Sequence, residues 1–221
     1  GSEVGHLHIN SGRIVEQELK TINKSIRSGQ FYKNAAFLKA INYVKKNNSR
    51  LHLIGLLSDG GVHSEISHLI ALLKLAKKHD VRQVYIHAFL DGRDVPQMSA
   101  KRYLMDLEKE IEKIHIGKIA TVIGRAYAMD RANRWERTKK AYNLLTKGKG
   151  KSLRIDPVYA IDKYYDKGHK DEYFPPLVFD KEGVLRGKDA VINFNFRADR
   201  MRQLAGAIAK NRFHFFKRKY F

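Results

Sequence analysis

The chain has 221 residues, a formal net charge of +20 and no cysteine. Its 43% hydrophobic content excludes a wholly disordered chain, and the lack of cysteine excludes disulfide frameworks and thiolate metal sites. No apolar run approaches the roughly 20 residues of a membrane helix, and the first residues do not resemble a signal peptide, so we expect a cytoplasmic protein without membrane contact.

In chain order, apolar spacing and turn residues predict alternating helices and strands. Asn34 and Asp156 stand at positions that favour helix caps, and Pro157 follows at a first helical position. The segment 171–187 is predicted to be a loop with a hairpin around 181–183. Helices are expected over 9–26, 35–46, 64–78, 99–114, 135–145, 155–167 and 201–209. Core strands are expected over 51–57, 84–90, 118–123 and 190–196.

Strands separated by helices indicate parallel pairing with right-handed crossovers. We therefore expect an α/β fold with three layers, in which a mostly parallel central sheet carries helices on both faces. Ligands of such folds bind outside the carboxyl ends of the strands. The residues that follow each core strand are thus the first place to search for a site.

Each core strand ends in a polar segment, called here a corner, and the four corners are 58–63, 91–94, 124–131 and 197–200. Arginine occurs in the last three of them, and its planar fork grips carboxylate or phosphate through two parallel hydrogen bonds. One Arg–Asp pair taken alone indicates a structural ion pair, whereas four such corners favour an anion site. The candidate residues are His63, Arg93, Asp94, Arg125, Asp130, Arg131, Arg197, Asp199 and Arg200.

Several candidates keep two interpretations. His63 is suited to donate a hydrogen bond to an anion, to act in acid–base chemistry or to cap a helix. Asp94 could accept a proton from a substrate hydroxyl, or it could brace Arg93. His52 and His87 lie within strands and are expected in the core or at an edge. On the helix over 64–78 and at its end, His68 and His79 are expected at the surface.

The charge also has two interpretations, a solvated lysine-rich surface or an anionic partner. The lysines are scattered, and neither zinc-finger spacing nor an aromatic RNA-binding motif occurs. Likewise, no HExxH motif, P-loop or GxGxxG pattern is present. A local site for a small anion is favoured, and a basic module that binds nucleic acid or an acidic partner is the alternative.

Five motifs, taken together, resemble the cofactor-independent (2,3-bisphosphoglycerate-independent) phosphoglycerate mutase family. In chain order these are SEVGHLHINSGRIV, LLSDGGVHS, IHAFLDGRDVP, TVIGRAYAMDRANRWERT and INFNFRADRMRQL. The resemblance implies that 1–14 is a remnant of an alkaline-phosphatase-like domain around the nucleophile. It implies that 15–221 is the inserted phosphotransferase domain, which binds substrate. The missing phosphatase domain and the aromatic tail RFHFFKRKYF lead us to expect truncation.

The family's chemistry gives the site residues their expected roles. Ser2 matches the serine that takes the phosphoryl group and touches one of two manganese ions, whose other ligands are mostly absent here. Gly1 stands where the family usually has asparagine, and a Gly–Ser start is also a common cloning remnant. Asp94 is expected to assist proton transfer at the glycerate hydroxyl. The residues that match the family's substrate-binding positions are His63, Arg93, Asp94, Arg125, Arg131, Arg197 and Arg200.

The implied activity is the glycolytic interconversion of 3-phosphoglycerate and 2-phosphoglycerate through a phosphoserine, without 2,3-bisphosphoglycerate. This chain would supply the arginine-rich cleft and be inactive alone. We expect a monomer that works with the missing phosphatase domain.

Overall fold

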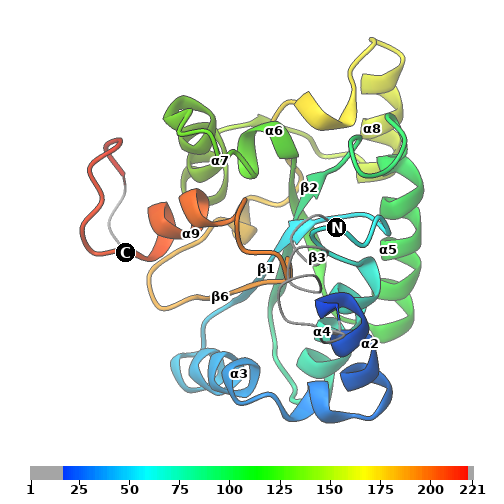
Figure 1. Ribbon diagram of the computed structural model, residues 1–221, viewed down its shortest axis with the longest axis vertical. Coiled ribbons are helices and arrows are strands. Elements are labelled where there is room, and N and C mark those ends of the chain that lie inside the picture. The colour runs from blue at the N-terminus through cyan, green and yellow to red at the C-terminus, as the bar shows by residue number, and fades with distance from the viewer. Residues whose placement is uncertain (1–16, 219–221) are drawn as a thin grey trace, which may run out of the picture.

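The computed structural model describes residues 17–218, in which helices cover both faces of a six-stranded sheet (Figure 1). The strand order is β4-β5-β3-β2-β1-β6, and the four neighbouring strands β3, β2, β1 and β6 are parallel. β5 pairs antiparallel with β3. The expected mostly parallel, three-layer α/β fold is confirmed. The strands are β1 (Leu51–Leu56), β2 (Val84–Leu90), β3 (Lys118–Gly124), β4 (Lys151–Ser152), β5 (Leu177–Val178) and β6 (Ala190–Asn193).

The helices begin and end close to the expected positions, and both predicted caps are present. The Asn34 side chain accepts hydrogen bonds from the backbone of α3, and Asp156 accepts one from the backbone of α8. The longer helices are α2 (Glu18–Arg27), α3 (Ala35–Asn47), α4 (Ile66–Lys78), α5 (Ala100–Ile114), α7 (Trp135–Lys147), α8 (Pro157–Tyr165) and α9 (Arg202–Ala209). Shorter turns are η1 (Gln30–Lys33), α6 (Arg125–Ala128), η2 (Asp171–Tyr173) and η3 (Lys181–Gly183).

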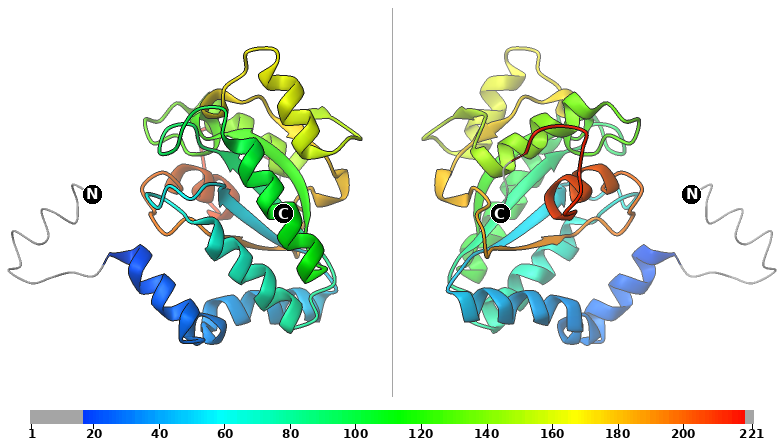
Figure 2. Two further views of the ribbon diagram at one scale, coloured as in Figure 1. Left: turned by 90° about the vertical axis from the view of Figure 1, so that its right-hand side faces the viewer. Right: turned by 90° about the vertical axis from the view of Figure 1, so that its left-hand side faces the viewer.

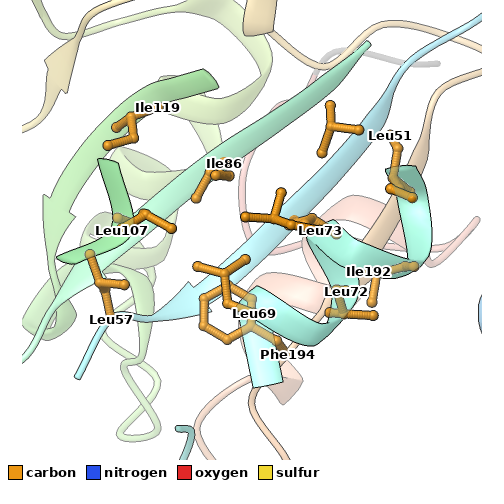
Figure 3. Packing of buried hydrophobic residues seen from close by; sticks show 14 of the residues in the cluster. Leu51, Leu57, Leu69, Leu72, Leu73, Ile86, Leu107, Ile119, Ile192 and Phe194 are labelled. Atoms are coloured by element: carbon orange, nitrogen blue, oxygen red, sulfur yellow. The ribbon is translucent and has the colours of Figure 1, made fainter. Parts of the chain in front are cut away.

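Alternation along the strands divides the core into two layers. Leu51 and Leu53 of β1 pack in one hydrophobic cluster with α3, α4 and α5, whereas Ile54 and Leu56 pack in the other with α7 and α9. Figure 1 shows these two groups of helices on opposite sides of the sheet, and Figure 3 shows Leu69 and Leu73 of α4 packed close to the strands of the first cluster. Burial on both faces explains why the strand sequences are almost continuously apolar.

The molecule has helices at both of its ends. Figures 1 and 2 show α2 and α3 at the end opposite α8. None of the helices within 17–218 has both the length and the apolar character needed to cross a bilayer. Ser2 lies outside the described residues, as does the first part of the helix expected over 9–26.

Two expectations about local structure are wrong. The predicted hairpin around 181–183 is a single helical turn, η3, because Asp180 accepts a hydrogen bond from the Glu182 backbone and holds the turn. His68 is 3% exposed instead of lying on the surface, because α2 packs against α4 and Asn23 bonds to its Nε2 at 2.8 Å.

His52 and His87 are core residues, as expected, and form a buried polar chain. His52 Nε2 lies 3.0 Å from Asp189 Oδ2, and His52 Nδ1 lies 3.0 Å from His87 Nε2. The chain continues from His87 Nδ1 to Thr121 Oγ1 at 2.8 Å, and Arg50 pairs with Asp189 at 2.8 Å. Both histidines have a pKa below the ordinary value, chiefly because burial disfavours the charged ring.

Candidate functional site

The four corners lie together at the carboxyl-terminal end of the sheet because the strands that precede them are parallel neighbours. Hydrogen bonds hold the corners of β1 and β6 together. The His63 carbonyl accepts a hydrogen bond from the Phe196 N–H at 2.9 Å, and Asn195 Oδ1 accepts one from the Leu56 N–H at 2.8 Å. The Ser64 hydroxyl in turn donates to the Leu56 carbonyl at 2.5 Å. These bonds fix His63 beside the corner that carries Arg197 to Arg200.

Arg125 lies at the centre of the site and is 3% exposed. Its Nη1 donates to Asp91 Oδ1 and to Asp94 Oδ2, both at 2.5 Å. Asp94 therefore contacts Arg125 and does not brace Arg93, which instead pairs with Glu172 at 3.4 Å from an exposed position. Charge-assisted bonds of this kind give the buried guanidinium a defined direction.

His63 is buried beside these groups. Its Nε2 lies 3.9 Å from Asp94 Oδ2, and its Nδ1 lies 3.9 Å from Asp199 Oδ1, which is longer than a hydrogen bond. Burial and then the Arg125 charge lower the pKa of His63 to about 4. The imidazole is thus neutral at pH 7 and keeps one N–H to donate. It does not cap α4, whose N-cap position is Glu65.

The last corner contributes a carboxylate between cations. Asp199 pairs with Arg131 at 2.7 Å and with Arg197 at 3.1 Å. Burial alone would raise the pKa of Asp199, but the Arg131 hydrogen bond and the Arg197 charge hold that pKa below its ordinary value. Arg200, by contrast, lies among other cations. Burial lowers its pKa, and repulsion from Arg131, Arg125 and Arg93 lowers it further.

Four of the seven expected binding residues line one cavity of about 280 Å³, called here the arginine cavity. Arg125 Nη2 and Arg200 Nε are buried and have no hydrogen-bond partner within residues 17–218. Unsatisfied buried donors in a crowd of guanidinium groups favour an anionic ligand. Asp94 contacts the lining residue Arg125, whereas His63 and Arg197 do not line the cavity and lie next to Asp94 and Asp199. The charged and aromatic lining residues are Arg93, Arg125, Asp130, Arg131, Arg134, Arg137, Glu172, Tyr173 and Arg200.

Sequence reasoning missed one wall of the arginine cavity, the segment 171–174. Asp171 is fully buried and accepts hydrogen bonds from the Ser99 and Ala100 backbone, at 2.9 and 3.1 Å, and from Tyr165. The segment packs so closely over Gly124 that any β-carbon there would collide with its backbone. Glu172 and Tyr173 are thereby held against the corners of β2 and β3. The polar letters DEY within a predicted loop offered no signal for this placement.

Asp130, another candidate, has a structural role in its contacts. Its carboxylate accepts hydrogen bonds from the Ala132 and Arg134 backbone, each at 3.0 Å, and from Gln203 of α9. Although burial would raise the pKa of Asp130, these bonds, first among them that of Gln203, hold the pKa below its ordinary value. Asp130 therefore ties the third corner to α9.

The manganese ions implied by the resemblance are expected to have most of their ligands outside this chain. Within residues 17–218, no three or more His, Asp or Glu side chains are arranged to hold a metal ion. Ser2, the metal ligand expected in this chain, lies outside that range.

Comparison with known proteins adds a consistent result. The family model described as BPG-independent PGAM N-terminus matches residues 22–221. The 2,3-bisphosphoglycerate-independent phosphoglycerate mutase of Clostridium acetobutylicum is 53% identical over 98% of this chain and 43% of its own length. That of Clostridium botulinum (strain ATCC 19397) is 52% identical over 99% of this chain and 43% of its own length.

A solved structure agrees with these sequence matches. The crystal structure of Leishmania mexicana phosphoglycerate mutase at low cobalt concentration superposes with a TM-score of 0.86 and 30% sequence identity. The superposition covers 93% of this chain and 40% of that chain. The chain thus spans less than half the length of the curated relatives and the structure it matches.

Proposed function

The chain belongs to the BPG-independent phosphoglycerate mutase family, and from this premise we propose that its arginine cavity holds 3-phosphoglycerate and 2-phosphoglycerate. Because the chain spans 43% of its relatives' length, the activity proposed is that of the whole protein. Residues 15–221 would form its substrate-binding domain. The remaining length would supply the phosphatase part, together with residues 1–14.

One observation carries the proposal. Arg125 and Arg200 line the cavity together with Arg93 and Arg131, and each has a buried N–H group without a hydrogen-bond partner among residues 17–218. Phosphoglycerate carries a carboxylate and a phosphate, and each is a group that arginine binds in a bidentate manner. Anion binding would satisfy the buried donors and offset the repulsion that, after burial, lowers the pKa of Arg200.

The reaction proposed for the whole protein has two transfers. The Ser2 hydroxyl attacks phosphorus and gives up its proton, the bond between phosphorus and the 3-oxygen breaks, and the 3-oxygen takes up a proton in exchange. Glycerate stays held by the arginines. Its 2-hydroxyl then attacks the phosphoserine and passes its proton to Asp94. The bond between phosphorus and Ser2 breaks, the Ser2 oxygen takes up a proton, and Asp94 releases the one it accepted. Neutral His63, beside Asp94, donates a hydrogen bond to the bound anion.

Calorimetry of 3-phosphoglycerate with this chain at low salt tests the binding part. Arg125→Ala is expected to weaken binding by about tenfold or more, since a hydrogen bond to a charged group contributes roughly 1.5–3 kcal/mol. Arg186→Ala is the matched control, because it removes an equal charge from an exposed ion pair with Glu182. Equal affinities of the two variants would contradict the proposal.

A coupled assay of the purified 221-residue chain tests whether this chain has mutase activity without the remaining length of its relatives. We expect no conversion of 3-phosphoglycerate to 2-phosphoglycerate, because the relatives use a chain more than twice as long. Robust conversion by this chain would show that the remaining length is not needed.

A further inference from the structure

Among the buried carboxylates near the arginine cavity, Asp91 accepts the most hydrogen bonds within residues 17–218. It does not itself line the cavity. It is 1% exposed and follows β2 directly. Its Oδ2 accepts a hydrogen bond from the Ser58 hydroxyl at 2.6 Å. Its Oδ1 accepts from the backbone N–H groups of Arg93 and Asp94, at 3.1 and 3.0 Å, and from Arg125. One side chain thus connects three of the four corners.

The connection determines how Arg125 is presented. Nη1 of Arg125 donates to both Asp91 and Asp94, which leaves Nη2 without a partner within residues 17–218. The backbone bonds from Asp91 also fix Asp94, the second carboxylate on the same nitrogen. Asp91 therefore fixes both the plane of the Arg125 guanidinium and the orientation of Asp94. Asp91 itself is too deeply buried to contact a ligand.

We propose that Asp91 is a positioning residue that pre-organises Arg125 and Asp94 for phosphoglycerate. This inference rests on the proposed function of the arginine cavity. Pre-organised donors bind an anion without the entropic cost of ordering them during binding. Loss of the Asp91 charge frees Arg125 to rotate, so affinity falls although every group that touches the ligand remains.

The amino-terminal end of the strands, where Arg50 and Asp189 lie, provides a matched control. Asp189 has a side chain that is 4% exposed, and it pairs with Arg50 at 2.8 Å just as Asp91 pairs with Arg125. Asp189→Asn removes the same charge from another buried pair, whose side chains are 9% and 4% exposed against 3% and 1% for Arg125 and Asp91, far from the corners. If Asp91 acted only through fold stability, the two Asn variants would have the same consequence for the site.

Calorimetry with 3-phosphoglycerate is the first test. Asp91→Asn is expected to weaken binding by about tenfold, and Asp189→Asn by less than about twofold, once both are shown to be folded. In an Arg125→Ala background, Asp91→Asn is expected to add less than about twofold, because its effect passes through Arg125. Independent, multiplying effects of the two substitutions would overturn the proposal.

Nuclear magnetic resonance of the Arg125 guanidinium is the second test and needs no ligand. The hydrogens on Nη1 and Nη2 are expected to give separate signals in the parent chain and in Asp189→Asn, and averaged signals in Asp91→Asn. Unchanged signals in Asp91→Asn would overturn the proposal, even if the parent chain bound no phosphoglycerate and the proposed function failed. Should Asp91→Asn not fold, Ser58→Ala replaces it and is expected to broaden the same signals; sharp, separate signals would count against positioning.

Discussion

Acid is expected to destabilise the fold through its buried histidines, His63 and His68. Both are 3% exposed, and burial lowers the pKa of each to about 4. In the unfolded chain the pKa is ordinary, about 6.5. The unfolded state therefore binds more protons between these values. Stability is fully present above the unfolded pKa and is lost as the pH falls toward the folded pKa.

The magnitude follows from these pKa values. Between pH 7 and pH 5, each histidine costs about 2 kcal/mol of unfolding free energy, and the pair costs about 4 kcal/mol. His52 and His87 act in the same direction, since their pKa values are also lowered. This loss is a large part of the stability of an ordinary domain, which is roughly 5–15 kcal/mol.

Urea denaturation followed by circular dichroism at the two pH values measures the effect. His68→Gln keeps a donor for Asn23 Oδ1 and removes one titrating group, so the loss between pH 7 and pH 5 should shrink by about 2 kcal/mol. His214→Gln, at an exposed position of the described tail, is the control. If His68→Gln loses as much stability on acidification as the parent chain, His68 is not a buried neutral group and the reasoning fails.

Three further predictions concern the cap, the wall of the arginine cavity and its charge. Asn34→Ala should lower the unfolding free energy by about 1 kcal/mol in urea titrations, and no change would mean that the cap bonds at α3 contribute nothing. Gly124→Ala should cost about 1–3 kcal/mol and weaken ligand binding, because its β-carbon would push Glu172 and Phe174 away; a neutral result would contradict that packing. Raising salt from about 50 to about 500 mM should weaken phosphoglycerate binding several-fold, whereas salt-independent affinity would argue against arginine contacts.

Much of the fold could be predicted from local patterns. The apolar runs of the four core strands stop where polar residues begin, and the intervening helices require parallel pairing, so the four corners share one edge. Caps such as Asn34 and Asp156 depend only on neighbouring residues and were equally accessible. The roles of the seven substrate-binding residues stay predictions.

What could not be predicted depends on contacts between distant segments. His68 has a helical position that a single helix would expose, and only the packing of α2 over α4 buries it. Asp91 resembles any turn aspartate until the fold brings Arg125 to it. Glu172 and Tyr173 reach the arginine cavity because the buried carboxylate of Asp171 anchors their segment across the chain.

The central claim, that phosphoglycerate binds at the carboxyl edge of the sheet, is tested most directly by mapping backbone amide chemical shifts during titration with 3-phosphoglycerate. The account predicts saturable shifts at 58–64, 91–94, 124–134 and 196–200, with none around Arg50 and Asp189 at the opposite edge. Shifts confined to other surfaces, or no saturable shifts at millimolar ligand, would contradict it.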